Sequence, residues 1–173
     1  MSDGDKHLLL VGMMGAGKTT VGRLVAAALG RPYRDSDAMV QEATGHSVPE
    51  LFATRGEATF RAAESDALRV AVEPPPAVIS VAGGAVLDPA NRALLAKSGT
   101  VVWLRAEPQT LASRLGDGVG RPLLAPDPPR VLADLDSVRR PLYAEVADVV
   151  VDVDELEPAQ VAEAVLRIAA RVR

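Results

Sequence analysis

The 173-residue sequence contains no cysteine, has only three lysines among its nineteen basic residues, and has no apolar run that approaches a membrane span. Without cysteine there is no disulfide framework and no thiolate chemistry. The formal net charge of −4 disfavours a general nucleic-acid binder, which needs a basic face. The apolar residues 8–11 are too few for the core of a secretory signal. We therefore expect a cytoplasmic protein without nucleic-acid or membrane partners, and one domain over residues 1–173.

One of the three lysines lies in a glycine-rich segment. Residues 12–19 read Gly-Met-Met-Gly-Ala-Gly-Lys-Thr, which matches G-x-x-x-x-G-K-[ST] between an apolar run and a helix-like stretch. Such a loop points backbone N–H groups at phosphate oxygens, and the following helix adds its positive end. Lys18 is then expected to reach the β- and γ-phosphates of a nucleotide, and the Thr19 hydroxyl to ligate Mg²⁺. A chance glycine-rich turn is the alternative, and the scarcity of lysine argues against it.

Strand-like apolar runs alternate with helix-like stretches along the chain. The predicted strands are residues 7–11, 32–34, 78–81, 100–104 and 149–153. The predicted helices are residues 18–29, 38–44, 48–54, 57–72, 89–97, 108–115, 130–146 and 158–171. This alternation predicts an α/β protein with a parallel sheet covered on both faces, whose ligands bind at the carboxyl ends of the strands.

The second predicted strand leads into Asp35-Ser36-Asp37. In such a sheet these carboxylates lie near the phosphate loop. Asp35 is expected to hold Mg²⁺, directly or through water, because hard cations prefer oxygen ligands. Asp37 is expected to accept hydrogen bonds from a substrate hydroxyl or to take its proton during phosphoryl transfer. Capping of the following helix is the alternative for these residues.

Further polar groups follow along the chain, and each has a plain structural alternative. Arg61 and Glu64 share one face of a predicted helix, which an ordinary i,i+3 ion pair also explains. The Gly83-Gly84 pair after the third strand suits close approach of a ligand or a tight turn. Residues 116–129 have no apolar period and are predicted to form a surface lid that carries Arg121.

A second arginine pair precedes Pro141, which is expected to kink or end its helix. Arg139 and Arg140 at such a point suit a carboxylate or phosphate, or they complement the negative end of the helix.

These segments together resemble the shikimate kinase family. The resemblance covers residues 7–158 and depends on GMMGAGKTTVGR (12–23), DSD (35–37), LFATRGEATFR (51–61), Gly83-Gly84, RPLL (121–124) and RRPLY (139–143). It implies a three-layer P-loop kinase fold whose five-stranded parallel sheet has the order 2-3-1-4-5. It also implies a substrate-binding region at about residues 35–63 and a lid at about 116–129. In this family ATP phosphorylates the 3-hydroxyl of shikimate, a step toward aromatic amino acids.

The resemblance also implies a role for each matching residue. The residues implied to bind ATP are Gly15, Ala16, Gly17, Lys18, Thr19, Thr20, Arg114, Arg121 and Pro158, with Arg114 and Pro158 beside the adenine. The implied metal-site residues are Thr19 and Asp35, with Asp35 acting through water. The implied shikimate-binding residues are Asp37, Arg61, Gly83, Gly84 and Arg139, with Glu64 behind Arg61. Lys18, Asp37 as the base and Arg121 as the lid arginine are the implied catalytic residues.

Two positions depart from the family pattern. Ala82 stands where the family turn usually has a first glycine, and Arg140 stands where many members have a small residue. We expect Ala82 to keep a negative φ with its N–H available, while the two glycines make the turn. Two alternatives remain open: a kinase of another small polyol such as gluconate or a cyclitol, and a non-catalytic nucleotide-binding module. The expected partners are ATP and shikimate, and the chain is expected to be a monomer.

Overall fold

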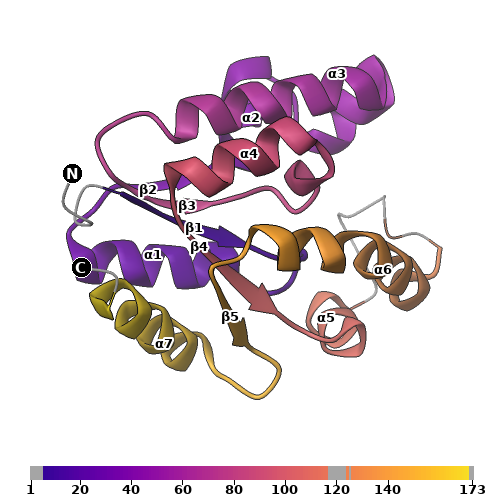
Figure 1. Ribbon diagram of the computed structural model, residues 1–173. Helices are drawn as coiled ribbons and strands as arrows, with labels where there is room; N and C mark the ends of the chain where they lie inside the picture. Colours follow the sequence, from indigo (N-terminus) through magenta and orange to yellow (C-terminus); the bar gives the residue numbers. More distant parts are fainter. Residues whose placement is uncertain (1–5, 117–123, 125, 172–173) are drawn as a thin grey trace.

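The computed structural model describes residues 6–116, 124 and 126–171, and it shows a parallel β-sheet flanked by helices (Figure 1). The strands are β1 (His7–Val11), β2 (Tyr33–Asp35), β3 (Val78–Ser80), β4 (Gly99–Arg105) and β5 (Val149–Asp152). The helices are α1 (Lys18–Leu29), α2 (Ser36–Thr44), α3 (Val48–Ala71), α4 (Pro89–Ser98), α5 (Pro108–Leu115), α6 (Pro128–Val146) and α7 (Pro158–Arg171). Within the described residues, no helix combines the length and the apolar character that crossing a membrane requires.

The strands lie in the order β2-β3-β1-β4-β5, and every neighbouring pair is parallel. This confirms the predicted α/β class and strand order. All of β1 is buried, which explains the apolar run of residues 8–11, because both faces of a parallel sheet are covered. The strand order reverses at β1. The segment that follows β1 therefore lies where ligands bind in such sheets.

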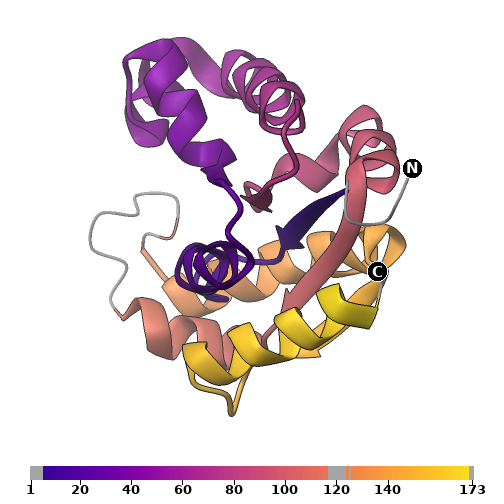
Figure 2. The same cartoon turned by 90° about the vertical axis from the view of Figure 1, so that its left-hand side faces the viewer.

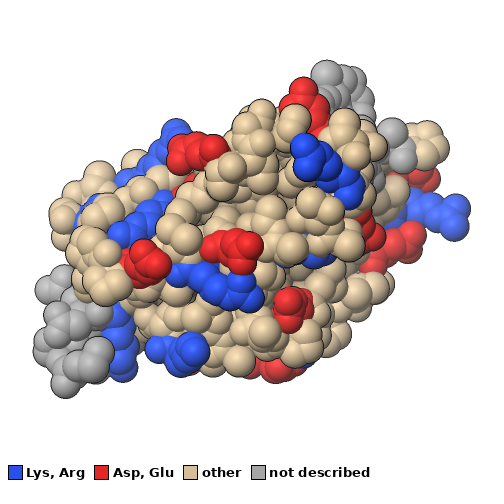
Figure 3. Space-filling model, turned by 90° about the horizontal axis from the view of Figure 1, so that it is seen from above, with Lys and Arg blue, Asp and Glu red and all other residues tan. Residues whose placement is uncertain are grey.

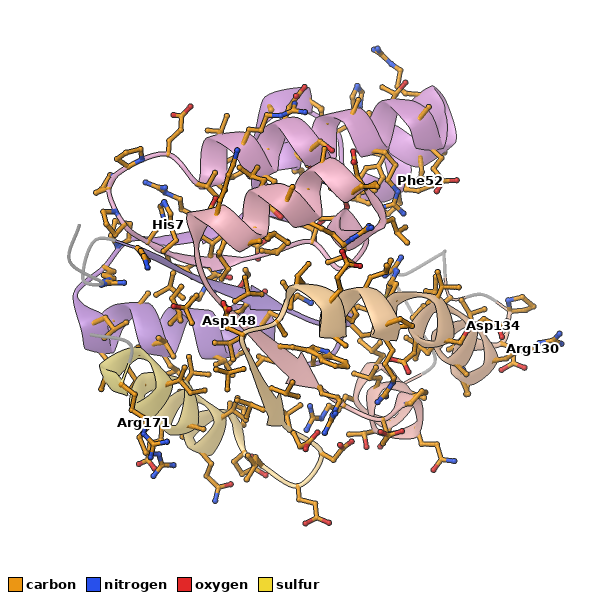
Figure 4. The ribbon with its side chains drawn as sticks, viewed as in Figure 1. His7, Phe52, Arg130, Asp134, Asp148 and Arg171 are labelled. Atoms are coloured by element: carbon orange, nitrogen blue, oxygen red, sulfur yellow. The ribbon has the colours of Figure 1, made fainter. Side chains whose placement is uncertain are left out.

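Helices cover the sheet on both sides. Helices α1 and α7 pack against each other on one side, and α4 and α6 pack against β4 from the other (Figure 1). The main core lies between these layers and includes the fully buried side chains of Leu9, Ile79 and Leu104. Asp148, labelled in Figure 4, accepts the backbone N–H of Val101 at 2.8 Å and so ties the turn before β5 to β4.

Helix α2 and most of α3 form an arm, residues 36–67, that stands apart from the sheet (Figure 2). The arm has its own small core of Val40, Leu51, Phe60 and Ala67. The helical path breaks at Gly56, where φ is 79° and ψ is 170°. This break matches the two separate helices predicted from the sequence, and a left-handed φ is readily adopted only by glycine.

Two predicted helix boundaries need correction. Helix α2 begins at Ser36 and not at residue 38, because the Asp35 side chain accepts the N–H groups of Asp37 and Ala38 and caps it. Helix α6 begins at Pro128, so the end of the predicted lid is helical. It runs through Pro141 to Val146, the end that the predicted range 130–146 gives, because side chains on both sides of the proline are packed: Arg139 and Tyr143 are both buried.

The surface carries charges of both signs. On the face shown in Figure 3, acidic and basic side chains of the described residues are interspersed over α2, α3 and α4, without a continuous basic surface.

Candidate active site

A cleft of about 790 Å³ lies at the carboxyl ends of β1, β2 and β3. The phosphate loop forms one side of it, and residues of α3 and α6 form the other. The sequence-predicted site residues that line it are Gly15, Gly17, Lys18, Thr19, Thr20, Asp35, Asp37, Arg61, Gly83, Gly84, Arg114 and Arg139. The fold thus brings most of the predicted residues to one place, although they come from six separate segments of the chain.

The loop after β1 is tightly wound against the sheet. A Cβ atom on Gly12, whose φ is 145°, would lie 2.5 Å from the carbonyl oxygen of Leu104, so only glycine fits there. The Lys18 ammonium donates to the carbonyls of Gly12 and Met13 at 2.8 and 3.0 Å. No side chain caps the N-terminus of α1 at Gly17. The loop therefore presents a cation and a positive helix end to the cleft, the features that bind phosphate.

Asp35 caps helix α2, the alternative that the sequence allowed, and it also contacts the phosphate loop. Its Oδ1 accepts the N–H groups of Asp37 and Ala38 at 3.0 and 3.3 Å, while its Oδ2 accepts the Thr19 hydroxyl at 3.2 Å. The described residues contain no group of three or more His, Cys, Asp or Glu that could enclose a metal ion. A metal at Thr19 and Asp35 would therefore complete its coordination with phosphate oxygens and water, which fits Mg²⁺.

Two arginine side chains from different helices meet at the turn after β3. A Cβ atom on Gly84 would lie 2.2 Å from Arg61 Nη1, and one on Gly83 would lie 3.3 Å from Arg139 Nη1. Neither glycine has a positive φ, so close approach of the arginines, rather than backbone conformation, is what favours glycine here. Arg139 is 7% exposed and its Nε has no hydrogen-bond partner in the described structure. A buried, unsatisfied donor of this kind is suited to an anionic ligand.

A buried carboxylate supports these arginines. Glu64 Oε1 accepts from Arg61 Nη1 at 2.8 Å, and Glu64 is only 2% exposed. Burial raises the pKa of the Glu64 carboxyl above its ordinary value, and the Arg61 guanidinium opposes that rise. The nearby Asp37 carboxylate adds to the rise and Arg139 opposes it, so these four charges act on one another across the cleft. The i,i+3 ion pair expected from the sequence is therefore present, but it is part of the site.

Asp37 lies in the first turn of α2 with its side chain exposed to the cleft. The lining of the same cleft includes the phosphate loop and an apolar wall on the arm. That wall contains Phe52, labelled in Figure 4, whose ring centroid lies 4.7 Å from that of Phe60. The cleft thus combines phosphate-binding, acidic, cationic and apolar surfaces, which is what phosphoryl transfer to a small polar ring requires.

Comparisons with known proteins agree with this geometry. Residues 14–170 match the family model described as shikimate kinase. A shikimate kinase of Stenotrophomonas maltophilia is 46% identical over 149 residues, which cover 86% of this chain and 83% of that one. One of Pseudomonas syringae pv. tomato is 42% identical and covers 96% of each chain.

The chain belongs to the shikimate kinase family. The solved shikimate kinase from Acinetobacter baumannii, in complex with shikimate, has a TM-score of 0.92 and 35% identity and covers 96% of this chain and 93% of that one. The resemblance seen in the sequence motifs is confirmed, and the chain is a phosphoryl-transferring enzyme. These relatives do not favour the gluconate or cyclitol kinase or the non-catalytic module.

The residues expected beside the adenine, Arg114 and Pro158, lie next to the phosphate loop. A smaller cavity of about 200 Å³ adjoins the phosphate loop and is lined by Ala16, Arg114 and Pro158, among others. Arg114 is held over it, because its Nη2 donates to the Val153 carbonyl at 2.7 Å. Arg121, the predicted lid arginine, lies outside the described residues.

Ala82 and Arg140, the two residues that depart from the family pattern, both make hydrogen bonds within the protein. The described residues include no non-glycine residue with a positive φ, so the expected negative φ of Ala82 is confirmed. The expectation that its N–H stays available is wrong, because it donates to Ser36 Oγ at 2.8 Å. Arg140 turns away from the cleft, toward Asp136 at 2.7 Å and Glu107 at 3.3 Å, and leaves the site to Arg139.

Several side chains at the site were not predicted from the sequence. Tyr143 is fully buried and donates to the Gly83 carbonyl at 2.7 Å, so it anchors the glycine turn to α6. Burial raises its pKa above the ordinary tyrosine value, so the hydroxyl remains a donor. Tyr33 and Ser80 lie under Asp35, 2.9 Å from each other. The placement of Tyr33 two residues before Asp35 on a predicted strand was the available signal, because alternate residues share a face.

Proposed function

We propose that this chain transfers the γ-phosphoryl group of ATP to the 3-hydroxyl of shikimate, giving shikimate 3-phosphate and ADP on the route to aromatic amino acids. ATP-dependent phosphorylation of shikimate is the activity of the family to which the chain belongs. The observation that carries the substrate assignment is the convergence of Arg61 and Arg139 on the Gly83-Gly84 turn. Two guanidinium groups at one point can grip a planar carboxylate, as shikimate carries and a neutral cyclitol does not.

The phosphate loop supplies the electrostatic part of the reaction. Lys18 leaves its contacts with the Gly12 and Met13 carbonyls to meet the β- and γ-phosphates, and the loop N–H groups from Gly15 to Thr20 hold the phosphate chain. Thr19 and Asp35 are the residues that would hold Mg²⁺. When bound, Mg²⁺ supplies positive charge to the β- and γ-phosphate oxygens. Such stabilisation is the main demand of phosphoryl transfer.

Residues around the shikimate-binding part of the cleft position the shikimate hydroxyl and take its proton. Asp37 accepts the hydroxyl proton, and the carboxylate grip of Arg61 and Arg139 fixes the ring so that one hydroxyl lies in line with the γ-phosphate. Arg114 and Pro158 flank the adenine. Arg121 on the lid completes the charge around the transferred group when the lid closes.

The proposal also concerns the organisation of the protein. We propose one kinase domain over residues 1–173 that acts as a cytoplasmic monomer without nucleic-acid or membrane partners. The net charge of −4 and the mixed charges in Figure 3 support the exclusion of nucleic acid. Light scattering on the purified chain measures its mass in solution, and a dimer would contradict the monomer.

An assay of ADP release against shikimate, quinate, gluconate and nucleoside monophosphates tests the function. We expect shikimate to be preferred, and NMR of the product to show phosphate on the oxygen at carbon 3. Turnover of gluconate in preference to shikimate would refute the substrate assignment. Arg69→Lys is the matched control for Arg61→Lys, because Arg69 lies exposed on the same helix and pairs with Asp66.

A further inference from the structure

A row of hydroxyl groups connects the phosphate loop to the Asp35 carboxylate. Ser80 Oγ lies 2.9 Å from the Lys18 carbonyl oxygen and 2.9 Å from the Tyr33 hydroxyl. The Tyr33 hydroxyl lies 3.2 Å from Asp35 Oδ2, the same oxygen that accepts the Thr19 hydroxyl. The proposed reaction assigns no role to Tyr33 or Ser80, although both contact residues that it uses.

The sheet places these groups together. In the parallel pairing of β2 with β3, Asp35 lies opposite Ser80 and Tyr33 lies opposite Val78. Tyr33 and Asp35 are two residues apart, so their side chains share one face of β2 with that of Ser80. That face carries α1, which begins directly after the phosphate loop.

The Tyr33 ring is held in position from the side of α1. A Cβ atom on Gly22 would lie 2.6 Å from Tyr33 Cε2 and 3.0 Å from Ser80 Oγ, so only glycine leaves room for the ring. The guanidinium carbon of Arg23 lies 5.7 Å from the ring centroid, within cation–π range. Packing therefore sets the position of the hydroxyl independently of any ligand.

The number of protons in this row restricts what it can do. The Lys18 carbonyl and the ionised Asp35 carboxylate only accept, while Ser80 and Tyr33 each have one proton to donate. Three contacts share two protons. If Ser80 donates to the Lys18 carbonyl, the Tyr33 proton has two acceptors, Ser80 Oγ and Asp35 Oδ2. The Tyr33 hydroxyl can thus donate its proton either to Asp35 Oδ2 or to Ser80 Oγ, and the proton is hydrogen-bonded in both cases.

We propose that Tyr33 is a positioning residue for the metal site: its hydroxyl holds Asp35 Oδ2 toward Thr19. Asp35 Oδ1 is already fixed by two backbone N–H groups at the start of α2. Without the tyrosine hydroxyl, Oδ2 keeps only the Thr19 hydroxyl among these contacts, and the carboxylate is less well oriented for the metal or its water. The inference rests on the proposed use of Mg²⁺ by Thr19 and Asp35.

The test measures ADP binding by calorimetry in saturating Mg²⁺ and in EDTA, for the wild type and Tyr33→Phe. The ratio of the Kd in EDTA to the Kd in Mg²⁺ reports how much the metal strengthens ADP binding, without any turnover. We expect Tyr33→Phe to reduce this ratio by up to about tenfold, the lower range for loss of a group that orients a metal ligand. Binding of ADP in EDTA should be unchanged, because the ring and the phosphate loop remain.

Ser65→Ala is the control variant, since the Ser65 hydroxyl is buried and accepts from Asn91 at 3.1 Å, but lies away from the loop. It should lower thermal stability without changing the ratio. A ratio in Tyr33→Phe equal to the wild-type ratio would overturn the inference. That includes the case in which ADP affinity falls equally with and without Mg²⁺. A wild-type ratio of one would instead overturn the proposed metal site itself.

Discussion

The sheet body and the α2–α3 arm differ in what holds them together. In the body, β1 is buried along its whole length within one continuous core. The arm has a separate core of only four buried side chains and a break in its helix at Gly56. The body carries the phosphate loop, whereas the arm carries Asp37 and Arg61. The proposed phosphate-binding part thus lies on the framework with the larger core, and the proposed acceptor-binding part lies on one that we expect to rearrange at lower cost.

The largest expected effect tests the body side of this comparison. Lys18→Ala removes the cation that we propose meets the transferred phosphoryl group, and we expect kcat to fall at least about 10²-fold, as for loss of one electrostatic stabiliser. Steady-state kinetics measure the loss. Lys97→Ala, on the exposed end of α4, should leave kcat unchanged. Near-normal turnover of Lys18→Ala would refute the phosphate-loop assignment.

A pair of core truncations tests the difference in stability directly. Leu9→Ala in the centre of the sheet should lower the free energy of unfolding by about 2–5 kcal/mol, because it leaves a cavity in a rigid core. Leu51→Ala in the arm should cost about 2 kcal/mol or less, because a small cluster can collapse around the gap. Urea unfolding gives both values, and hydrogen exchange should show Leu51→Ala loosening the arm alone. Equal, global losses would show that arm and body are one cooperative unit.

Arginine-to-lysine variants test the acceptor side. Arg61→Lys and Arg139→Lys keep the charge but lose the planar fork, and each should weaken shikimate binding by about 1.5–3 kcal/mol. The KM for ATP should change much less, because both side chains lie at the Gly83-Gly84 turn, where we propose that the shikimate carboxylate binds. Equal increases in both KM values would mean that these arginines serve the phosphates.

Ala82→Gly should have a smaller effect, because Ala82 already has a permitted φ and its N–H donates to Ser36 at 2.8 Å. We expect kcat/KM to change by less than about tenfold, or about 1.4 kcal/mol. A much larger gain would show that the Ala82 methyl group disturbs the acceptor site.

The smallest expected effects are on the pH dependence of stability, which should have opposite signs for His7 in the body and Glu64 in the arm. Burial lowers the pKa of His7, labelled in Figure 4, so its neutral form contributes stability above about pH 6.5 that is lost as pH falls. Burial raises the pKa of Glu64, so its contribution is present below about pH 4.5 and lost as pH rises through the folded-state pKa. The stability difference between wild type and His7→Gln should shrink toward acid pH. That between wild type and Glu64→Gln should shrink toward neutral pH, and trends of the same sign would contradict this assignment.

Patterns confined to short segments predicted much of the fold. The bounds of β1, α1, α5 and α7 agree with those expected, because periodicity, glycine and proline signals lie within the elements themselves. The start of α2 was wrong by two residues, since a side-chain cap from Asp35 competes with the apolar pattern. The start of α6 was also wrong by two residues, whereas its end at Val146 agrees with the predicted range, because burial on both sides of Pro141 outweighs the local preference of the proline.

The sequence by itself determined the phosphate loop, the α/β class and, through its motifs, the family, because the relevant residues are contiguous or follow in a distinctive order. Only the tertiary structure decided which groups meet: Tyr33 with Ser80 across 47 positions, Ala82 with Ser36 across 46, and Tyr143 with Gly83 across 60. It also showed that Gly84 leaves room for the Arg61 guanidinium. Such contacts depend on the packing of strands and helices distant in sequence, which local residue preferences do not encode.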